Sequence, residues 1–357
     1  MTRSFKLILT MFAVALLATT SRAENPAPLP DPDGKDADMT KPVKVFILMG
    51  QSNMLGFGKI NGGDGSLSHA TKEKGLYPYL IDDSGAWTTR KDVRNVFVMA
   101  GRRGMQTNNN EWLTIKNKNI GPEIGIGHYL GEALDGPVLI LKACIGNRCL
   151  GWDLLPAGAE RYEHGGKIHA GYQDSYSIVK GPWEKGSEPP KPDKGQWYAG
   201  WQYDIDIKNA NHVLENLGKY YPGATEYEVA GFFWWQGDKD RGRAEWYERY
   251  ETNLLTLIKA LREEFEAPKA PFVCATLGQS SKENASGGEK ALLEAMLAIS
   301  DHDKHPDLKG QTATIYTHPL SKGGASNSHY GGNAETYMNV GEAMGQAMVK
   351  LLSSNAD

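Results

Sequence analysis

The stretch "KVFILMGQSNMLGFG", from Lys44 to Gly58, joins the end of an apolar run to a single serine. The run Val43–Met49 is typical of a strand that is covered on both faces in a parallel sheet. Gly50 interrupts the run, and Ser52 follows at its tip. A serine that begins a helix there lies beside free backbone N–H groups, which can stabilise an oxyanion. Ser52 is therefore the candidate nucleophile, and a helix-capping serine is the alternative.

The rest of the chain alternates between strand-like and helix-like segments. Apolar runs of strand type occur at Val138–Ala143, Glu228–Trp235, Phe272–Leu277 and Thr312–Tyr316. Helical spacing of apolar residues occurs at Gly121–Leu134, Tyr203–Leu217, Ala244–Phe265 and Asn333–Leu352. This alternation predicts an α/β fold with a central parallel sheet that is covered on both faces. In such folds the functional site lies at the carboxyl ends of the strands.

The N-terminus has the features of an export signal. Residues 1–23 combine basic residues, an apolar run too short to span a bilayer, and a small-residue cleavage site, whereas an uncleaved anchor helix is the alternative. Residues 24–42 are rich in Pro and Asp and predict a disordered linker before a domain over 43–357. We therefore expect a secreted or periplasmic protein. The formal net charge of −4 argues against nucleic acid as a partner, and against a membrane once the signal is cleaved. The sequence does not indicate the oligomeric state.

Residues 151–201 interrupt the alternation of strands and helices. They are rich in glycine, proline and aromatic residues, and a long segment without periodicity is usually functional when it is not disordered. The aromatic rings can stack on sugars or pack the segment onto the body. We expect the segment to roof the cleft. Just before it, Cys144 and Cys149 can form a disulfide or remain buried thiols, and the sequence leaves both open.

Three further motifs follow predicted strands and carry groups that a serine nucleophile needs. "SNSHYGGNAETY" places His329 before the last helix, where it could act as the base. "FFWWQGDKD" places Gln236 at a strand end, where its amide could donate to an oxyanion, and "LKACIGNRCLGWD" places Gly146 and Asn147 at another. "DHDKH" at Asp301–His305 is better read as a solvated helix end than as a metal site.

Together these motifs resemble a known family. "GQSNM", "GPEIGIG", "KACIGN", "WWQGD" and the late "HY" are similar to the sialate O-acetylesterase-like family of SGNH hydrolases, which is related to the acetyl xylan esterases of carbohydrate esterase family six. The resemblance implies a flavodoxin-like three-layer α/β/α sandwich. It also implies a serine esterase that removes acetyl groups from carbohydrates without a metal or organic cofactor. By this resemblance Ser52 is the nucleophile and His329 the base, and the oxyanion hole comprises Ser52, Gly146, Asn147 and Gln236.

The chain departs from the family pattern at one position. Many relatives have an aspartate three residues before the histidine, where this chain has Ser326. Three alternatives follow: a Ser–His dyad oriented by a backbone carbonyl near Asn327, a carboxylate from Asp238 or Glu335, or an inactive protein that only binds carbohydrate. Candidate substrate contacts are Gln51, Asn53, Arg148, Trp152 and Trp235.

Overall fold

The computed structural model describes Leu29 and residues 36–174, 182–190 and 197–354. The predicted signal 1–23 and most of the predicted linker 24–42 lie outside these ranges. The described end of that linker lies on the body, because Asp36 bridges to Lys91 and the Asp38 N–H donates to the Asp135 carbonyl oxygen at 3.1 Å. Among the described residues no helix is long and apolar enough to cross a bilayer.

A seven-stranded sheet forms the centre of the molecule, in the order β12-β11-β10-β1-β6-β3-β4. All neighbouring strands are parallel except β3 and β4. The strands are β1 (Val43–Gly50), β3 (Thr89–Gly101), β4 (Gly104–Thr114), β6 (Val138–Ala143), β10 (Tyr227–Trp235), β11 (Phe272–Ala275) and β12 (Thr312–Ile315). The predicted parallel sheet is confirmed.

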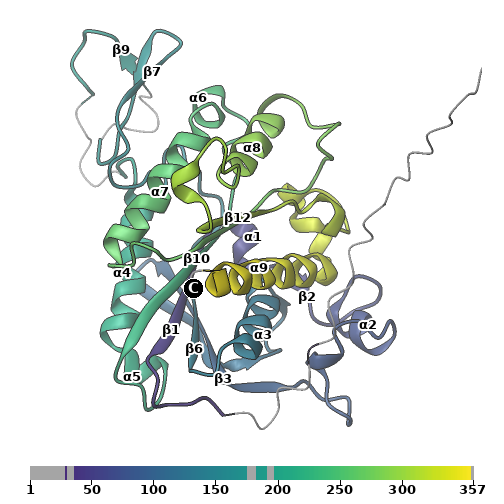
Figure 1. Ribbon diagram of the computed structural model, residues 1–357. Coiled ribbons are helices and arrows are strands. Elements are labelled where there is room, and N and C mark those ends of the chain that lie inside the picture. Colours follow the sequence, from purple (N-terminus) through teal and green to yellow (C-terminus); the bar gives the residue numbers. More distant parts are fainter. Residues whose placement is uncertain (1–28, 30–35, 175–181, 191–196, 355–357) are drawn as a thin grey trace, which may run out of the picture.

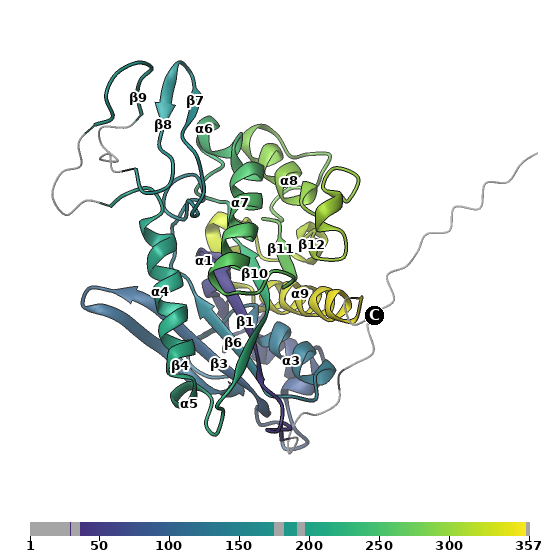
Figure 2. The same cartoon turned by 60° about the vertical axis from the view of Figure 1, so that its left-hand side comes forward.

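Helices cover both faces of the sheet (Figures 1 and 2). One layer contains α3 (Glu123–Ala133) and α9 (Ala334–Ser354), and the other contains α4 (Trp201–Glu215), α5 (Leu217–Tyr220), α7 (Tyr250–Glu264) and α8 (Gly287–Ala298). The three-layer α/β/α sandwich implied by the family resemblance is therefore present.

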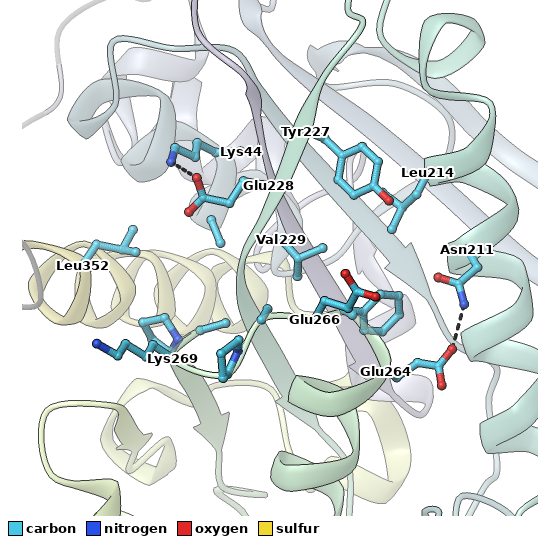
Figure 3. Close-up of a pocket in the computed structure, with 16 residues that line it drawn as sticks. Lys44, Asn211, Leu214, Tyr227, Glu228, Val229, Glu264, Glu266, Lys269 and Leu352 are labelled. Carbon is cyan, nitrogen blue, oxygen red and sulfur yellow. Dashed lines mark hydrogen bonds and ion pairs between the residues drawn. The ribbon is translucent and has the colours of Figure 1, made fainter.

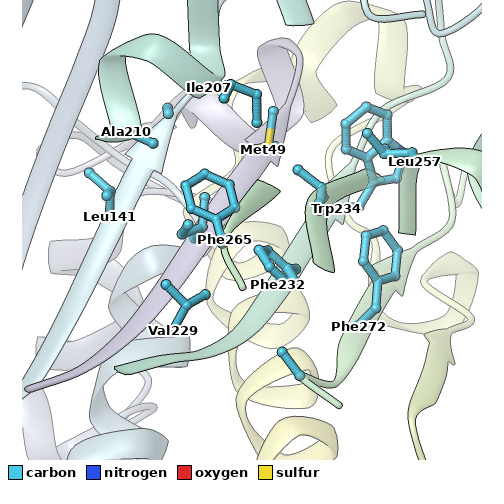
Figure 4. Close-up of a cluster of buried hydrophobic side chains, with 14 of the residues drawn as sticks. Met49, Leu141, Ile207, Ala210, Val229, Phe232, Trp234, Leu257, Phe265 and Phe272 are labelled. Carbon is cyan, nitrogen blue, oxygen red and sulfur yellow. The ribbon is translucent and has the colours of Figure 1, made fainter. Parts of the chain in front are cut away.

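Alternate residues of β1 enter the two layers. Ile47 and Met49 join an apolar cluster with α4 and α7, part of which is drawn in Figure 4. Phe46 and Leu48 join a second cluster with α3 and α9. Because successive side chains of a strand point to opposite faces, burial on both faces requires the continuous apolar run that the sequence shows.

Several elements differ from the expectation or complete it. The helix predicted over Ala244–Phe265 is divided into α6 (Ala244–Tyr247) and α7, because tertiary contacts hold α6 separately: Trp246 packs against Gly151, and Tyr162 donates to the Glu245 carbonyl oxygen. The β3–β4 hairpin and α8 were not predicted. Smaller elements are α1 (Ser52–Leu55), α2 (Leu67–Lys72) and the pair β2 (Gly58–Lys59) and β5 (Asn119–Ile120).

The described part of segment 151–201 forms a small antiparallel sheet. Its strands are β7 (Tyr162–His164), β8 (Lys167–His169) and β9 (Trp183–Glu184), and they project from the body in both views (Figures 1 and 2). Beneath them lies a separate apolar cluster of Cys149, Trp152, Leu155, Ala170, Trp183 and Ala199. Several of the aromatic rings therefore pack this segment. Cys144 and Cys149 are free, buried thiols.

Candidate active site

Ser52 begins α1 directly after the central strand. Gly50, the last residue of β1, pairs with Trp235 and has a φ of +143°, and an added Cβ would lie only 2.4 Å from the Trp235 carbonyl oxygen. Only glycine fits this turn without strain. Since β6 and β10 flank β1, the segments that follow these three strands meet at one edge of the sheet, which is where ligands bind in this architecture.

The turn after β6 lies beside Ser52. A Cβ added to Gly146 would lie 3.8 Å from the Ser52 Cβ. Arg148 donates from Nη1 to the carbonyl oxygens of Gly146 at 3.3 Å and Asn147 at 3.1 Å, and Lys239 donates to the latter at 3.2 Å. In a trans peptide the C=O of one residue is opposite the N–H of the next, so these bonds leave the N–H groups of Asn147 and Arg148 facing away from the two cations.

Gln236 lies beneath the site and does not have the role predicted for it. Its buried Nε2 donates to Asp240 Oδ2 at 2.6 Å, the Arg148 carbonyl oxygen at 2.8 Å and Gln51 Oε1 at 3.2 Å. Tyr250 donates to its Oε1 at 2.9 Å. Because acceptors within the protein occupy its N–H groups, the amide is not available to an oxyanion. It instead joins the segments after β1, β6 and β10.

Asp240 is a central residue of this network that sequence reasoning missed. Its carboxylate is buried and accepts the N–H of Leu150 at 3.0 Å and of Gly151 at 2.8 Å, besides the Gln236 amide. Burial raises the pKa of Asp240 to about 6, although these donors favour the ionised form. In the sequence only its four-residue spacing from Gln236 marked it, and nothing there ranked it above Asp238.

Asp238 connects the nucleophile helix to the histidine turn. Ser326 donates to its Oδ1 at 2.6 Å, and Asn53, next to Ser52, donates to its Oδ2 at 3.2 Å. Burial raises the pKa of Asp238, while the Ser326 hydrogen bond, the charge of Arg241 and, less strongly, that of His329 oppose this rise. Ser326, which replaces the family's aspartate, thus binds another carboxylate.

Glu335, the second predicted carboxylate, has other partners. It forms ion pairs with Lys74 at 2.6 Å and Lys322 at 2.5 Å. Burial raises the pKa of Glu335, but the two lysines outweigh burial and keep it below its usual range. Because both carboxylate oxygens are already paired, the structure does not support Glu335 as the orienting acid.

His329 lies in the turn Ser326–Gly332, which contacts α1. Its ring stacks on Phe57, with ring centroids 4.0 Å apart and an interplanar angle of 8°. The backbone of His329 is left-handed, with a φ of +53°, which is uncommon for a residue other than glycine and is held by its neighbours. One such neighbour is Tyr330, whose hydroxyl donates to the Leu277 carbonyl oxygen at 2.5 Å.

Four of the five predicted substrate contacts are buried. Trp235 is 0 % exposed and donates to the Thr276 carbonyl oxygen, and Trp152 belongs to the apolar cluster beneath β7–β9. Gln51 and Asn53 are buried beside Gln236 and Asp238. The burial of these four side chains does not support them as direct substrate contacts.

Arg148 is the exception among the predicted substrate contacts. It is half-buried, and its guanidinium lies 4.7 Å from the ring centroid of Trp197. Trp197 is 37 % exposed and stacks on Trp201, at 4.3 Å between ring centroids. Nothing in the sequence distinguished Trp197 from the other aromatic residues of its segment.

A cavity of about 950 Å³ lies at the opposite edge of the sheet (Figure 3). It includes the ion pair between Lys44 and Glu228 and the hydrogen bond from Asn211 to Glu264. These residues adjoin the amino ends of β1 and β10, so this cavity is remote from Ser52 and is not the candidate site.

An α/β/α sandwich whose central strand leads into a serine, with a histidine turn at the same edge, is the architecture of SGNH-type hydrolases. Residues 184–350 match the family model described as carbohydrate esterase, sialic acid-specific acetylesterase. Over these residues the chain is similar to this family of carbohydrate esterases, which agrees with the resemblance noted from the sequence. The matched region contains Gln236, Asp238 and His329, whereas Ser52 and Gly146 precede it.

The chain is also similar, more distantly, to several solved structures. A protein from Arabidopsis thaliana is 16% identical, with a TM-score of 0.46, over 86% of this chain and 98% of that one. A carbohydrate acetylesterase from Xanthomonas citri is 12% identical, with a TM-score of 0.47, over 85% of this chain and 55% of that one. NanS is 14% identical, with a TM-score of 0.40, over 77% and 78%. These values are too low to support an argument about activity. No curated protein matches the chain.

Proposed function

We propose that this protein is an exported serine esterase that removes O-acetyl groups from carbohydrates through an acetyl-enzyme. The observation that carries the proposal is the meeting of Ser52, Gly146, Asp238 and the His329 turn at the carboxyl edge of the sheet. The similarity of residues 184–350 to a carbohydrate esterase family supports the substrate class. Export rests on the signal-like sequence of residues 1–23.

In the first step, Ser52 Oγ attacks the acetyl carbonyl carbon while His329 accepts the hydroxyl proton. The carbonyl oxygen becomes an oxyanion, for which the N–H of Ser52 and those of the Gly146–Asn147 turn are the candidate donors. The C–O bond to the sugar then breaks, and the proton on His329 passes to the sugar oxygen. The products of this step are the free sugar hydroxyl and acetyl-Ser52.

In the second step, His329 takes a proton from water, and the resulting oxygen attacks the acetyl-enzyme. Collapse of the second oxyanion releases acetate and returns the proton to Ser52. In both steps the imidazole becomes positively charged. A carboxylate at Asp238 favours that charge, and among the candidates for the third member of the site we therefore select Asp238.

The test is hydrolysis of 4-nitrophenyl acetate and acetate release from acetylated xylan and O-acetylated sialic acid. We expect Ser52→Ala and His329→Ala each to lower kcat/KM by roughly 10³-fold or more, as loss of a nucleophile or base does. Ser300→Ala and His212→Ala make the same changes far from the site and should retain activity. If the wild type is no more active than Ser52→Ala on every ester, the esterase proposal fails and carbohydrate binding without catalysis replaces it.

A further inference from the structure

A second cavity lies on the β3–β4 side of α1. Its volume is about 370 Å³, within the range of roughly 300–1,000 Å³ that small-molecule sites occupy. The hairpin β3–β4, the segment 116–120, the start of α3 and the end of α1 form its walls.

Strand register explains which side chains reach this cavity. Asn95 pairs with Glu111, and Phe97 pairs with Asn109 on one side and Lys142 on the other. Paired residues in neighbouring strands point to the same face, and alternate residues of one strand do too. These five side chains therefore form two adjacent rows on one face of the sheet, and all five line the cavity.

Five charged residues line the cavity, and four of them form two ion pairs, while the fifth is the exposed Lys118. Lys142 pairs with Glu123 at 2.6 Å and donates to the Leu55 carbonyl oxygen at 2.9 Å, and Lys116 pairs with Glu111. A charged ligand would have to compete with these ion pairs, so the cavity favours an uncharged one.

The remaining polar lining consists mainly of asparagine amides. Asn95 is 6 % exposed, and its Oδ1 has no hydrogen-bond partner among the described residues. The other amides are Asn108, Asn109, Asn117 and Asn119. An amide offers a donor and an acceptor side by side, as neighbouring sugar hydroxyls require, and the half-buried ring of Phe97 offers an apolar surface for the C–H face of a sugar.

Leu55 lies between this cavity and the reaction centre. It lines the cavity, and its Cδ1 would lie 3.5 Å from a Cβ added to Gly146, the glycine that borders Ser52. A chain of linked sugars that presents an acetyl group to Ser52 could therefore extend past Leu55 into the cavity.

We infer that this cavity is a subsite for an uncharged sugar residue of the glycan that carries the acetyl group. This inference rests on the proposed function. With such a subsite, the enzyme would act best on oligosaccharides or polysaccharides. A substrate with a single sugar residue would leave the cavity empty.

The kinetic test compares O-acetylated monosaccharides with O-acetylated tetraoses of the xylan, mannan and cellulose types. We expect kcat/KM to be at least 10-fold higher on one tetraose than on its monosaccharide. Asn109→Ala and Asn119→Ala should each lower this ratio at least 5-fold through KM. Asn211→Ala removes the same amide at the opposite edge of the sheet and should preserve the ratio. Asn119 is exposed, so its removal keeps the test valid if Asn109→Ala fails to fold.

A binding test separates failure of this inference from failure of the proposed function. Calorimetry with Ser52→Ala and the unacetylated tetraoses requires no turnover, and adding Asn109→Ala should weaken binding at least 5-fold relative to adding Asn211→Ala. A wild type that hydrolyses 4-nitrophenyl acetate but does not prefer any tetraose would overturn the subsite alone. Tetraose binding that neither asparagine variant changes would overturn it as well.

Discussion

Asp238 follows β10 and contacts both the nucleophile helix α1 and the turn that contains His329. Its carboxylate is therefore a candidate to replace the aspartate that many relatives have at the position of Ser326. Ser326 cannot carry the negative charge, but its hydroxyl donates to the carboxylate of Asp238, which also accepts from Asn53. Ser326 lies three residues before His329 in the same turn, so its hydrogen bond brings Asp238 to the turn that carries the histidine. The negative charge of Asp238, which follows β10, could therefore stabilise the protonated His329. This is the alternative to a Ser–His dyad without a carboxylate.

Replacing Asp238 with asparagine tests this alternative. The change removes the negative charge that stabilises the imidazolium, which forms only during the reaction. We expect kcat for 4-nitrophenyl acetate to fall roughly 10- to 100-fold, about 1.4–2.8 kcal/mol in barrier, with KM changed less than about twofold. Asp303→Asn, which alters an exposed aspartate far from the site, is the matched control. An unchanged kcat in Asp238→Asn would favour the dyad.

At the scale of elements, the turn from β1 to α1 determines where the nucleophile lies. Gly50 combines a left-handed backbone with close contact to the neighbouring strand, so neither the conformation nor the space accommodates a side chain. The strand ends where it must bend around the Trp235 carbonyl, and Ser52 then falls at the first position of the helix. The position of the serine is thus a consequence of strand packing.

Adding a single methyl group to Gly50 should therefore destabilise the protein. We expect Gly50→Ala to lower the free energy of unfolding by roughly 3 kcal/mol or more, from backbone strain and overlap with Trp235. Gly63→Ala, where an added Cβ meets nothing within 4 Å, should change it by less than about 1 kcal/mol. Urea unfolding followed by tryptophan fluorescence measures both, and equal stabilities would contradict this account of the turn.

At the scale of the whole molecule, one sheet supports two apolar layers. Leu257 of α7 packs in one layer and Met344 of α9 in the other, and both are fully buried. β1 contributes to both layers through alternate residues, so neither layer can lose its packing without exposing a face of the same strand. The two layers should therefore unfold together.

Truncation in either layer tests this coupling. We expect Leu257→Ala and Met344→Ala each to lower the free energy of unfolding by about 2–5 kcal/mol, the usual loss for a large buried side chain. In both variants, near-ultraviolet circular dichroism and fluorescence should report one coincident transition. Exposed Lys259→Ala in α7 is the control and should leave the transition unchanged. Separate transitions for the two layers would contradict a common core.

The sequence by itself determined the order of most main strands and helices, and it indicated candidate residues for the chemistry. Buried strands require apolar runs, and covered helices require apolar residues at helical spacing, so these elements are properties of near neighbours in the chain. The β3–β4 hairpin was missed because its strands carry many charged and amide residues, "TRKDVRNVFVMAG" and "GMQTNNNEWLT". Part of that hairpin faces a polar cavity, where an apolar pattern is not required.

Only the tertiary structure decided what each polar group binds. The sequence predicted a free amide donor at Gln236, but Asp240 and the Arg148 carbonyl oxygen accept from this amide. It also offered Glu335 as a free acid, but two lysines pair with its carboxylate. These partners lie on different segments and come together through packing. Hydrogen bonds and burial depend on such distant neighbours, so no local pattern in the sequence can reveal them.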